Sequence, residues 1–147
     1  MLLLFALLAA LFVVVSALLA RAFSVDGAER SAITALVQAQ ARGDRGAMLS
    51  ELDRCRARPA CALRVQTNAV ALRQRGAVSI LQIQPSAGFS LTGSTGTARV
   101  AWSSPGSRPI VQCVRVRRAG NVLRGLRVEL LNISVRLKSD ATCPSRF

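Results

Sequence analysis

The stretch ALVQAQARGDRGAML, residues 35–49, predicts two consecutive helices with a sharp break between them. Its apolar side chains recur at spacings of three and four residues, which is typical of an amphipathic helix, and Gly43 ends that pattern. Asp44 follows the glycine and can cap the next helix through its carboxylate. We expect the first of these helices to begin at a cap formed by Ser24 or Asp26.

A third helix is predicted from Pro59 to Gly76. Proline suits the first turn of a helix, and the residues from Arg54 to Pro59 end the preceding one. Apolar positions at helical spacing give the third helix one face for the core, formed by Ala62, Val65, Ala69 and Leu72. Three helices therefore come first in the globular part of the chain.

After Gly76 the apolar residues alternate with polar ones, which predicts strands. The alternation over residues 78–83 slips once in phase, which indicates a bulge. Phe89 and Leu91 extend this strand or begin another, before a turn at 93–96. Further strands are predicted at 97–102, 110–116 and 122–137, with a loop at 103–109, a hairpin at 119–121 and a second slip of phase near 130–132.

Helices followed by a curved antiparallel meander of about four strands predict an α+β fold in which the helices cover one sheet face. This order, the domain size and the run at residues 35–49 resemble the NTF2-like (cystatin-like, SnoaL-like) superfamily over most of residues 24–138. The resemblance implies a cone-shaped domain and carries over no catalytic residue. The general architecture is also similar to actinobacterial Mce-associated membrane proteins, in which a basic, disulfide-bearing domain follows an anchor.

The first 20 residues are apolar except for Ser16. A helix of this length rises about 30 Å, the thickness of the hydrocarbon core of a bilayer. The segment lacks the basic start of a secretory signal and is longer than its usual apolar region, which favours an uncleaved anchor over cleavage after Ala22. We expect an anchor or signal segment at 1–22 and an exported domain at 23–147. The domain is then extracytoplasmic on a single-pass membrane protein, or secreted if the segment is cleaved.

Four cysteines bear on the compartment. An even number behind an export segment is typical of two disulfides in an oxidising compartment, and a zinc site would need closer pairs or histidine. Cys55 and Cys61 form a natural local pair around Pro59, and Cys113 then pairs with Cys143 by default. Because bridged Cα atoms lie within about 7 Å of each other, the second pairing requires the tail to bend back, and three connectivities stay open.

The composition excludes several kinds of catalysis. The 147 residues contain no His and no Tyr, so Ser-His-Asp, Cys-His and HExxH chemistries are excluded, and we expect no metal or cofactor. A steroid-isomerase-like site of the NTF2 class would also use a Tyr as oxyanion donor. Glu129 is the one weak catalytic candidate, and a surface ion pair is its preferred interpretation. Other acids are expected at helix starts or in surface ion pairs: Asp26, Glu29, Asp44, Glu51 and Asp53.

Twenty basic residues against seven acidic ones give a formal net charge of +13. Arginines of one phase on neighbouring strands gather on one sheet face, which predicts a surface for anionic lipid or an acidic polymer. The preferred interpretation is a solvated face that binds no ligand and whose arginines reflect the codon usage of a G+C-rich genome. Nucleic acid is disfavoured because few aromatic residues are available for stacking and Trp102 is expected in the core. The candidate residues are Arg99, Arg115, Arg117, Arg118, Arg124 and Arg136.

Three classes of function follow. A non-catalytic exported module that binds or scaffolds a partner protein or a small apolar ligand is preferred. The alternative is an isomerase- or hydrolase-type enzyme that uses Glu129 or Asp53 with Gln82 or Gln112. A pilin-like subunit is a further alternative, although there is no basic leader ending in glycine, no Glu near position 5, and an early helix break at Gly43. A filled concave face would favour partner binding or a structural role, including oligomers, and an apolar cavity would favour ligand carriage.

Overall fold

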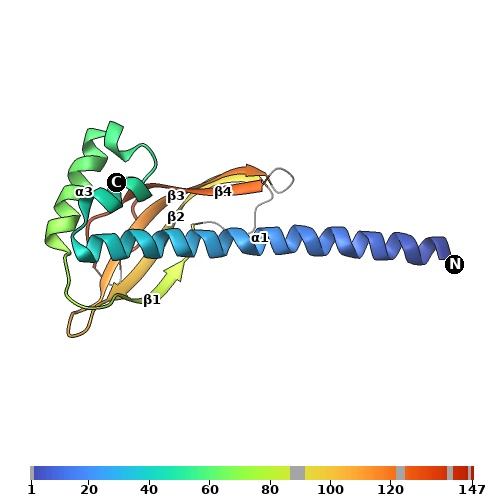
Figure 1. The fold of residues 1–147 in the computed structure, drawn as a ribbon, viewed down its shortest axis with the longest axis horizontal. Helices are drawn as coiled ribbons and strands as arrows, with labels where there is room; N and C mark the ends of the chain where they lie inside the picture. The colour runs from blue at the N-terminus through green and yellow to red at the C-terminus, as the bar shows by residue number, and fades with distance from the viewer. Residues whose placement is uncertain (1, 87–91, 122–124, 139–140, 146) are drawn as a thin grey trace.

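The computed structural model describes residues 2–86, 92–121, 125–138, 141–145 and 147. Within these residues the chain forms helices and then one antiparallel sheet with the strand order β1-β2-β3-β4, so the predicted α+β class is confirmed (Figure 1). The elements are α1 (Leu2–Arg42), α2 (Arg45–Glu51), a short 3-10 helix (Cys55–Ala57), α3 (Pro59–Ala71), β1 (Ser79–Gln84), β2 (Thr92–Ser103), β3 (Ile110–Asn121) and β4 (Gly125–Ile133).

α1 is one uninterrupted helix of 41 residues. The expected cap at Ser24 or Asp26 is therefore wrong, since both residues lie inside α1. The reason is local: no proline occurs in this segment, and its one glycine, Gly27, costs only about 1 kcal/mol relative to alanine in a helix interior. The N-terminal half of α1 projects from the domain, and its C-terminal half lies along the sheet (Figure 1).

The break after α1 and the starts of the next helices follow the sequence. Gly43 has a φ of 74°, a left-handed conformation that glycine adopts without strain. Asp44 caps α2 by accepting a hydrogen bond from the Ala47 amide at 2.9 Å. Pro59 occupies the first turn of α3, as predicted, but α3 already ends at Ala71.

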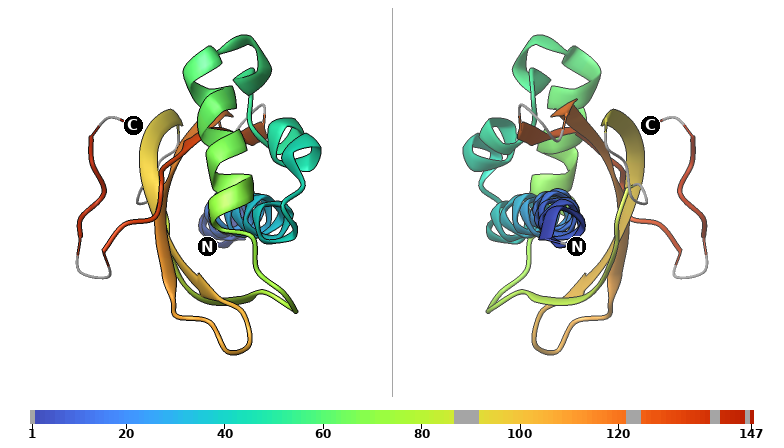
Figure 2. Two further views of the ribbon diagram at one scale, coloured as in Figure 1. Left: turned by 90° about the vertical axis from the view of Figure 1, so that its left-hand side faces the viewer. Right: turned by 90° about the vertical axis from the view of Figure 1, so that its right-hand side faces the viewer.

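The sheet curves around the helices (Figure 2). The pairing of β1 with β2 shifts between Ile80 and Gln82. The pairing of β3 with β4 shifts between Arg115 and Val116, opposite residues 130–132. Both slips of phase in the sequence are thus confirmed as irregularities of the ladder, and such bulges bend a sheet.

The turn expected at 93–96 is wrong, because these residues belong to β2. The predicted hairpin between the last two strands is confirmed, but residues 119–121 are still paired in β3, so its turn comes after Asn121. Both strands are longer than predicted. Gly96 is explained by close packing, because an added Cβ would lie 1.9 Å from the Ser86 carbonyl oxygen. A glycine that permits such an approach has the same sequence appearance as a glycine in a turn.

The chain after β4 crosses to the other side of the sheet. β4 ends at Ile133, whereas the alternation predicted a strand to 137. Leu137 keeps only an isolated antiparallel bridge to Val111. The tail then lies on the sheet face opposite the helices (Figure 2).

One apolar core lies between the helices and the concave sheet face. Trp102 is fully buried there, as predicted. The segment after α2 covers the β4 edge, since Leu52 bridges Leu130 and the Asp53 amide donates to the Leu130 carbonyl at 2.7 Å. This contact blocks part of the β4 edge from pairing with another chain. Other fully buried large side chains of the core are Ile33, Leu36, Met48, Ile110 and Ile133.

Candidate functional site

The concave face, where a ligand cavity would lie, is filled by a hydrogen-bonded network around Gln112. Gln112 Oε1 accepts hydrogen bonds from Trp102 Nε1 at 3.0 Å and from Gln40 Nε2 at 2.7 Å. Its Nε2 donates to the Ser134 carbonyl at 2.9 Å and to Gln40 Oε1 at 3.2 Å. Asn68 Nδ2 donates to the same Ser134 carbonyl at 2.9 Å. The network joins α1, α3, β2, β3 and the segment after β4 inside the core.

No polar group of the Gln112 amide is left for a ligand, because both donors and both acceptor sites are used. Hollows in the described part of the chain are lined by other residues, near the ends of strands and along α3. The concave face is therefore a packed core. Asn68 is a poor helix former in the middle of α3, and its side chain is one of the anchors of this core.

A buried ion pair fastens α1 to the sheet. Arg118 donates to Glu29 Oε2 from Nε at 2.9 Å and from Nη2 at 2.8 Å, and from Nη2 also to Asp26 at 2.5 Å. Glu29 also accepts hydrogen bonds from the Ser86 amide at 2.7 Å and the Ser86 hydroxyl at 3.0 Å. Glu29 is 1% exposed and Arg118 is 5% exposed. The sequence predicted Glu29 in the first turn of a helix and Arg118 on the surface of the sheet, and both predictions are wrong because the two side chains are buried against each other.

The charge of Arg118 is stabilised in place. Burial by itself lowers the pKa of Arg118, but hydrogen bonds and charge interactions with Glu29 and Asp26 outweigh it, so the pKa lies above its ordinary value. The stabilisation that comes from the raised pKa of Arg118 is thus present below the ordinary arginine pKa as long as its partner carboxylates are ionised, and it is lost as the pH rises through the raised pKa. Glu29 has every oxygen engaged and lines no described hollow, so the pair acts structurally.

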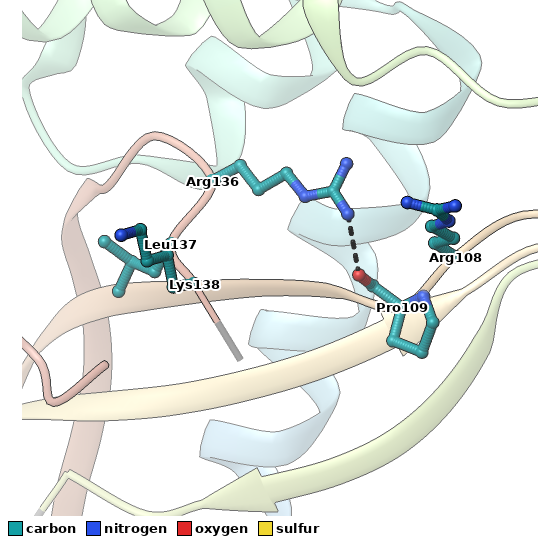
Figure 3. Close-up of a pocket in the computed structure, with 5 residues that line it drawn as sticks. All are labelled: Arg108, Pro109, Arg136, Leu137 and Lys138. Atoms are coloured by element: carbon teal, nitrogen blue, oxygen red, sulfur yellow. Dashed lines mark hydrogen bonds between the residues drawn. The ribbon is translucent and has the colours of Figure 1, made fainter. Parts of the chain in front are cut away.

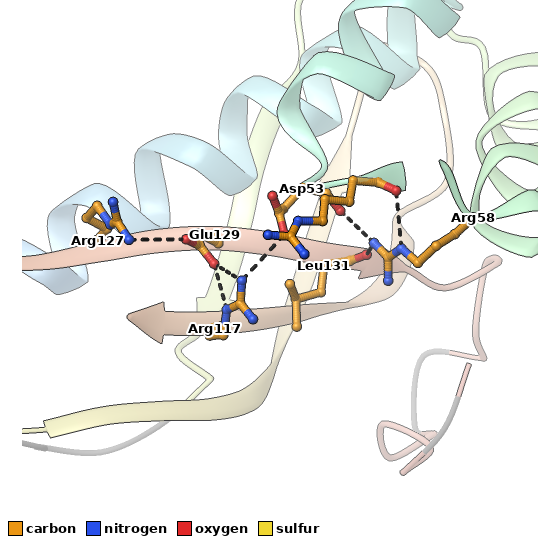
Figure 4. Close-up of polar contacts among 7 residues, drawn as sticks. Asp53, Arg58, Arg117, Arg127, Glu129 and Leu131 are labelled. Carbon is orange, nitrogen blue, oxygen red and sulfur yellow. Dashed lines mark hydrogen bonds and ion pairs between the residues drawn. The ribbon is translucent and has the colours of Figure 1, made fainter. Parts of the chain in front are cut away.

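Glu129 lies in an ion-pair cluster on the outer face of the sheet (Figure 4). Arg117 Nε donates to Glu129 Oε2 at 2.6 Å, and Arg117 Nη2 lies 3.5 Å from Asp53 Oδ2. Arg127 approaches the other Glu129 oxygen at 3.9 Å. The preferred interpretation of Glu129 as an ion-pair residue is confirmed, with Arg117 as the closer partner. Nearby, Arg58 donates to the Asp53 carbonyl at 2.7 Å.

The candidate enzymatic residues do not converge. Gln112 faces the core on β3, whereas Glu129 faces away from it on β4. Asp53 lies at the β4 edge beside Arg117, and Gln82 is an exposed residue of β1. The structure therefore brings together Glu129 with Asp53, but in an arginine cluster rather than in a cavity.

Both predicted disulfides form. Cys55 and Cys61 are joined across a Cα–Cα distance of 5.4 Å, and Cys113 and Cys143 across 5.8 Å. A hairpin at 119–121 would place Cys113 level with Arg127, but the longer β3 places it beside Ser134, whose amide donates to the Cys113 carbonyl at 2.8 Å. The tail therefore needs less chain to return to Cys113 than the sequence indicated.

The arginines predicted to share one surface lie in several environments. Arg117 is engaged with acids, and Arg118 is buried in the core side of the sheet. Arg115 is half-buried on the outer face. Arg99 lines a hollow beneath the tail, together with Thr142 and Cys143 of that tail. Arg124 lies outside the described residues.

Arg136 lines a different hollow, which we call the basic hollow, with a volume of about 660 Å³. Arg136 Nη2 donates to the Pro109 carbonyl at 3.1 Å, as Figure 3 shows. Among the described residues, the hollow has three cationic side chains, Arg108, Arg136 and Lys138, and all three are exposed. Pro109 and Leu137 are its other described lining residues. Sequence reasoning missed Arg108 and Lys138, because residues 28 positions or more apart come together only when the segment after β4 returns beside the start of β3.

The described residues contain no metal-binding cluster and one helix of membrane-spanning length. No group of three or more His, Cys, Asp or Glu that could hold a metal occurs in the described part of the chain. One described helix, α1, is long and apolar enough to cross a membrane, with a mean hydropathy of 2.5 over its most apolar 18 residues. Comparisons with protein-family models, characterised proteins and solved structures gave no significant match.

Proposed function

We propose that this chain is a single-pass membrane protein whose extracytoplasmic domain is a non-catalytic binding or scaffolding module for a partner. The observation that carries the proposal is the division of α1 into two halves. The large apolar side chains from Leu4 to Leu19, apart from the half-buried Leu18, are 43–72% exposed, whereas Ile33, Leu36 and Val37 are fully buried. One helix thus offers an apolar surface at one end and supports the domain at the other.

A bilayer is the environment that best accommodates the apolar half. Exposed apolar patches of this extent are uncommon on soluble monomers, and lipid removes the cost of hydrating them. Every backbone group of the helix interior is hydrogen-bonded within the helix, as a spanning segment requires. The two disulfides support an oxidising compartment for the domain.

An uncleaved anchor is favoured over a cleaved signal. Residues 20–22, which contain the small-x-small sequence, lie within α1. Proteases prefer exposed loops and frayed segments, so cleavage there requires the helix to unwind locally. The anchor then stays joined to the domain through continuous helix.

The filled concave face supports a non-catalytic module and a partner in place of a small apolar ligand. Gln112 and Trp102 occupy the centre of that face, and Glu129 is held by Arg117 on the other side. A chain without His or Tyr also lacks the usual acid–base groups of the superfamily it resembles. We propose, together with this function, that the domain belongs to the NTF2-like superfamily that its sequence resembles.

The test combines membrane extraction, protease accessibility and mass measurement on the full chain expressed in bacteria. We expect the protein to resist alkaline carbonate extraction, to be digested by protease in spheroplasts, and to retain the mass of the sequence from Met1. A carbonate-soluble protein, or a domain digested only after the inner membrane is opened, would contradict the proposal. A mass that corresponds to a chain starting at Phe23 would instead identify the secreted form.

A filament subunit is the second candidate, and the uninterrupted α1 favours it. The helix carries an apolar half beyond the sheet, and such halves can pack together in the core of a filament. Filaments sheared from intact cells that contain the chain would support this function. Recovery only in the membrane fraction, as a particle of constant small size in detergent, would exclude it.

A further inference from the structure

We propose that the end of the domain farthest from the apolar half of α1 binds a polyanionic polymer, with the basic hollow as its principal site. The polymer is a flexible chain that carries closely spaced phosphate or carboxylate groups. Arg108, Arg136 and Lys138 supply the charges, and Pro109 and Leu137 supply apolar contact for the polymer backbone.

The position of the hollow follows from the alignment of α1 with β3. Glu29, near the point where α1 leaves the domain, contacts Arg118 near the end of β3. Gln40, near the end of α1, contacts Gln112 near the start of β3. Arg108 precedes β3 and therefore lies at the end of the domain away from the apolar half. At 1.5 Å per residue, this end is about 30 Å from the apolar half along the helix.

No carboxylate among the described residues neutralises the charges of the hollow. Four of the acidic residues are engaged in the two clusters around Arg117 and Arg118. Among the described residues, no carboxylate lies within 4.0 Å of the side-chain nitrogens of Arg108, Arg136 or Lys138. None of the described residues that line the hollow is acidic. Three like charges around one hollow favour a ligand with several anionic groups.

The geometry of the donors suits oxyanions. The hydrogen bond from Arg136 Nη2 to the Pro109 carbonyl holds one edge of the guanidinium and leaves its other N–H groups for a ligand. Arg108 adds a second guanidinium, and Lys138 adds a compact ammonium. Guanidinium groups bind phosphate and carboxylate through paired N–H donors, which a hydrated ammonium supplements as a point charge.

A second basic hollow at the same end makes an extended ligand preferable to a single ion. It has a volume of about 490 Å³ and is lined by Arg42, Arg73, Gln74 and Arg75. Residues 73–75 lie on the loop after α3, which continues to Gly76. Gly76 packs against Pro105 of the β2–β3 loop, since an added Cβ would lie 3.3 Å from the proline ring. A polymer that engages both hollows gains affinity by multivalency. Headgroups of the membrane that holds α1 lie too far away.

The experiment uses the full chain in nanodiscs of zwitterionic lipid and measures binding of fluorescent polyphosphate and of polyglucuronate at two salt concentrations. The site variant combines Arg108→Gln, Arg136→Gln and Lys138→Gln. The matched control combines Arg30→Gln, Arg56→Gln and Arg127→Gln, which removes the same charge from exposed residues outside the described hollows. A third variant, Arg108→Lys with Arg136→Lys, keeps the charge of the site.

We expect the site variant to bind about tenfold more weakly than the unchanged chain, since three charge-assisted contacts are lost. The control should stay within about threefold, and added salt should weaken binding of the unchanged chain. The lysine variant keeps the charge but lacks the paired N–H donors, so its affinity should lie between those of the unchanged chain and the site variant. Tighter binding of polyphosphate or of polyglucuronate identifies the anionic group. Equal losses in the site variant and the control, or no binding of either polymer, would overturn the proposal. Site-dependent binding to anionic vesicles without binding to either polymer would also overturn it.

An envelope polymer as the natural source rests on the extracytoplasmic topology of the proposed function, whereas the site itself does not. Protease accessibility tests the topology, and nanodisc binding tests the site. A cytoplasmic domain that still binds both polymers through Arg108, Arg136 and Lys138 would therefore refute the first and retain the second.

Discussion

Glu29 places a fully buried carboxylate against Arg118 where α1 leaves the sheet. Glu29→Gln keeps the shape of the side chain but leaves the buried arginine with Asp26 as its remaining partner. We expect a loss of about 3 kcal/mol in the free energy of unfolding, measured by denaturant titration in detergent, because breaking a buried pair strands one charge.

Asp26→Asn is the matched control for Glu29→Gln. The Asp26 side chain is 42% exposed, so its contribution to the ion pair is screened by solvent and the loss should be clearly smaller. Equal losses in the two variants would contradict the structural role assigned to Glu29.

Gln40 and Gln112 form a reciprocal pair of hydrogen bonds in the core. Replacing either one by leucine leaves the other amide with unsatisfied groups, at a cost of about 1–3 kcal/mol for each buried group. In a double-mutant cycle we expect Gln40→Leu with Gln112→Leu to cost less than the sum of the single variants. Additive unfolding free energies would show that the two amides do not share the network.

At the scale of elements, the two disulfides close loops of very different length. Cys55–Cys61 spans 6 residues and Cys113–Cys143 spans 30. In the chain-entropy description, the longer loop stabilises by about 4 kcal/mol and the shorter by about 2 kcal/mol. Replacing both cysteines of a pair by serine should therefore lower the free energy of unfolding more for Cys113–Cys143. A reversed order in denaturant unfolding would contradict this account.

Elements set by neighbouring residues were predictable, and those set by distant contacts were not. Asp44 and Pro59 act on the first turn of their own helices, so the sequence predicts both helix starts. Gly96 lies against the backbone of Ser86, which is 10 residues away in sequence. Because this contact leaves no mark in the local sequence, the sequence predicts a turn at Gly96 where the structure has a strand. Arg118 meets Glu29 across 89 residues, and no local pattern marks such a pair.

For the whole molecule, the proposed single-pass topology makes membrane association depend on the apolar half of α1. Replacing Leu8, Leu11 and Val15 by arginine adds three charges to the segment, each costing about 2.5–3.5 kcal/mol at the centre of a spanning helix. We expect the variant to move from the carbonate-resistant to the soluble fraction. The control variant carries arginine at three exposed apolar positions of the domain, Leu63, Val70 and Val135, and should stay in the membrane. Loss of membrane association in both variants would contradict a specific role of α1.

The sequence by itself determined the helices-then-strands order, the two bulges, the local Cys55–Cys61 disulfide and the apolar segment, because each depends on residue spacing or on short-range geometry. The Cys113–Cys143 disulfide was one of several open connectivities and needed the return of the tail to β3. Only the tertiary structure decided that α1 is continuous across residues 20–24 and fastened by Glu29 to Arg118. It also decided that Gln112 fills the concave face and that Arg108, Arg136 and Lys138 meet. The physical reason is that buried polar pairs and surface charge clusters join residues far apart in the chain, and only the packing of α1 and of the segment after β4 on the sheet brings them within contact.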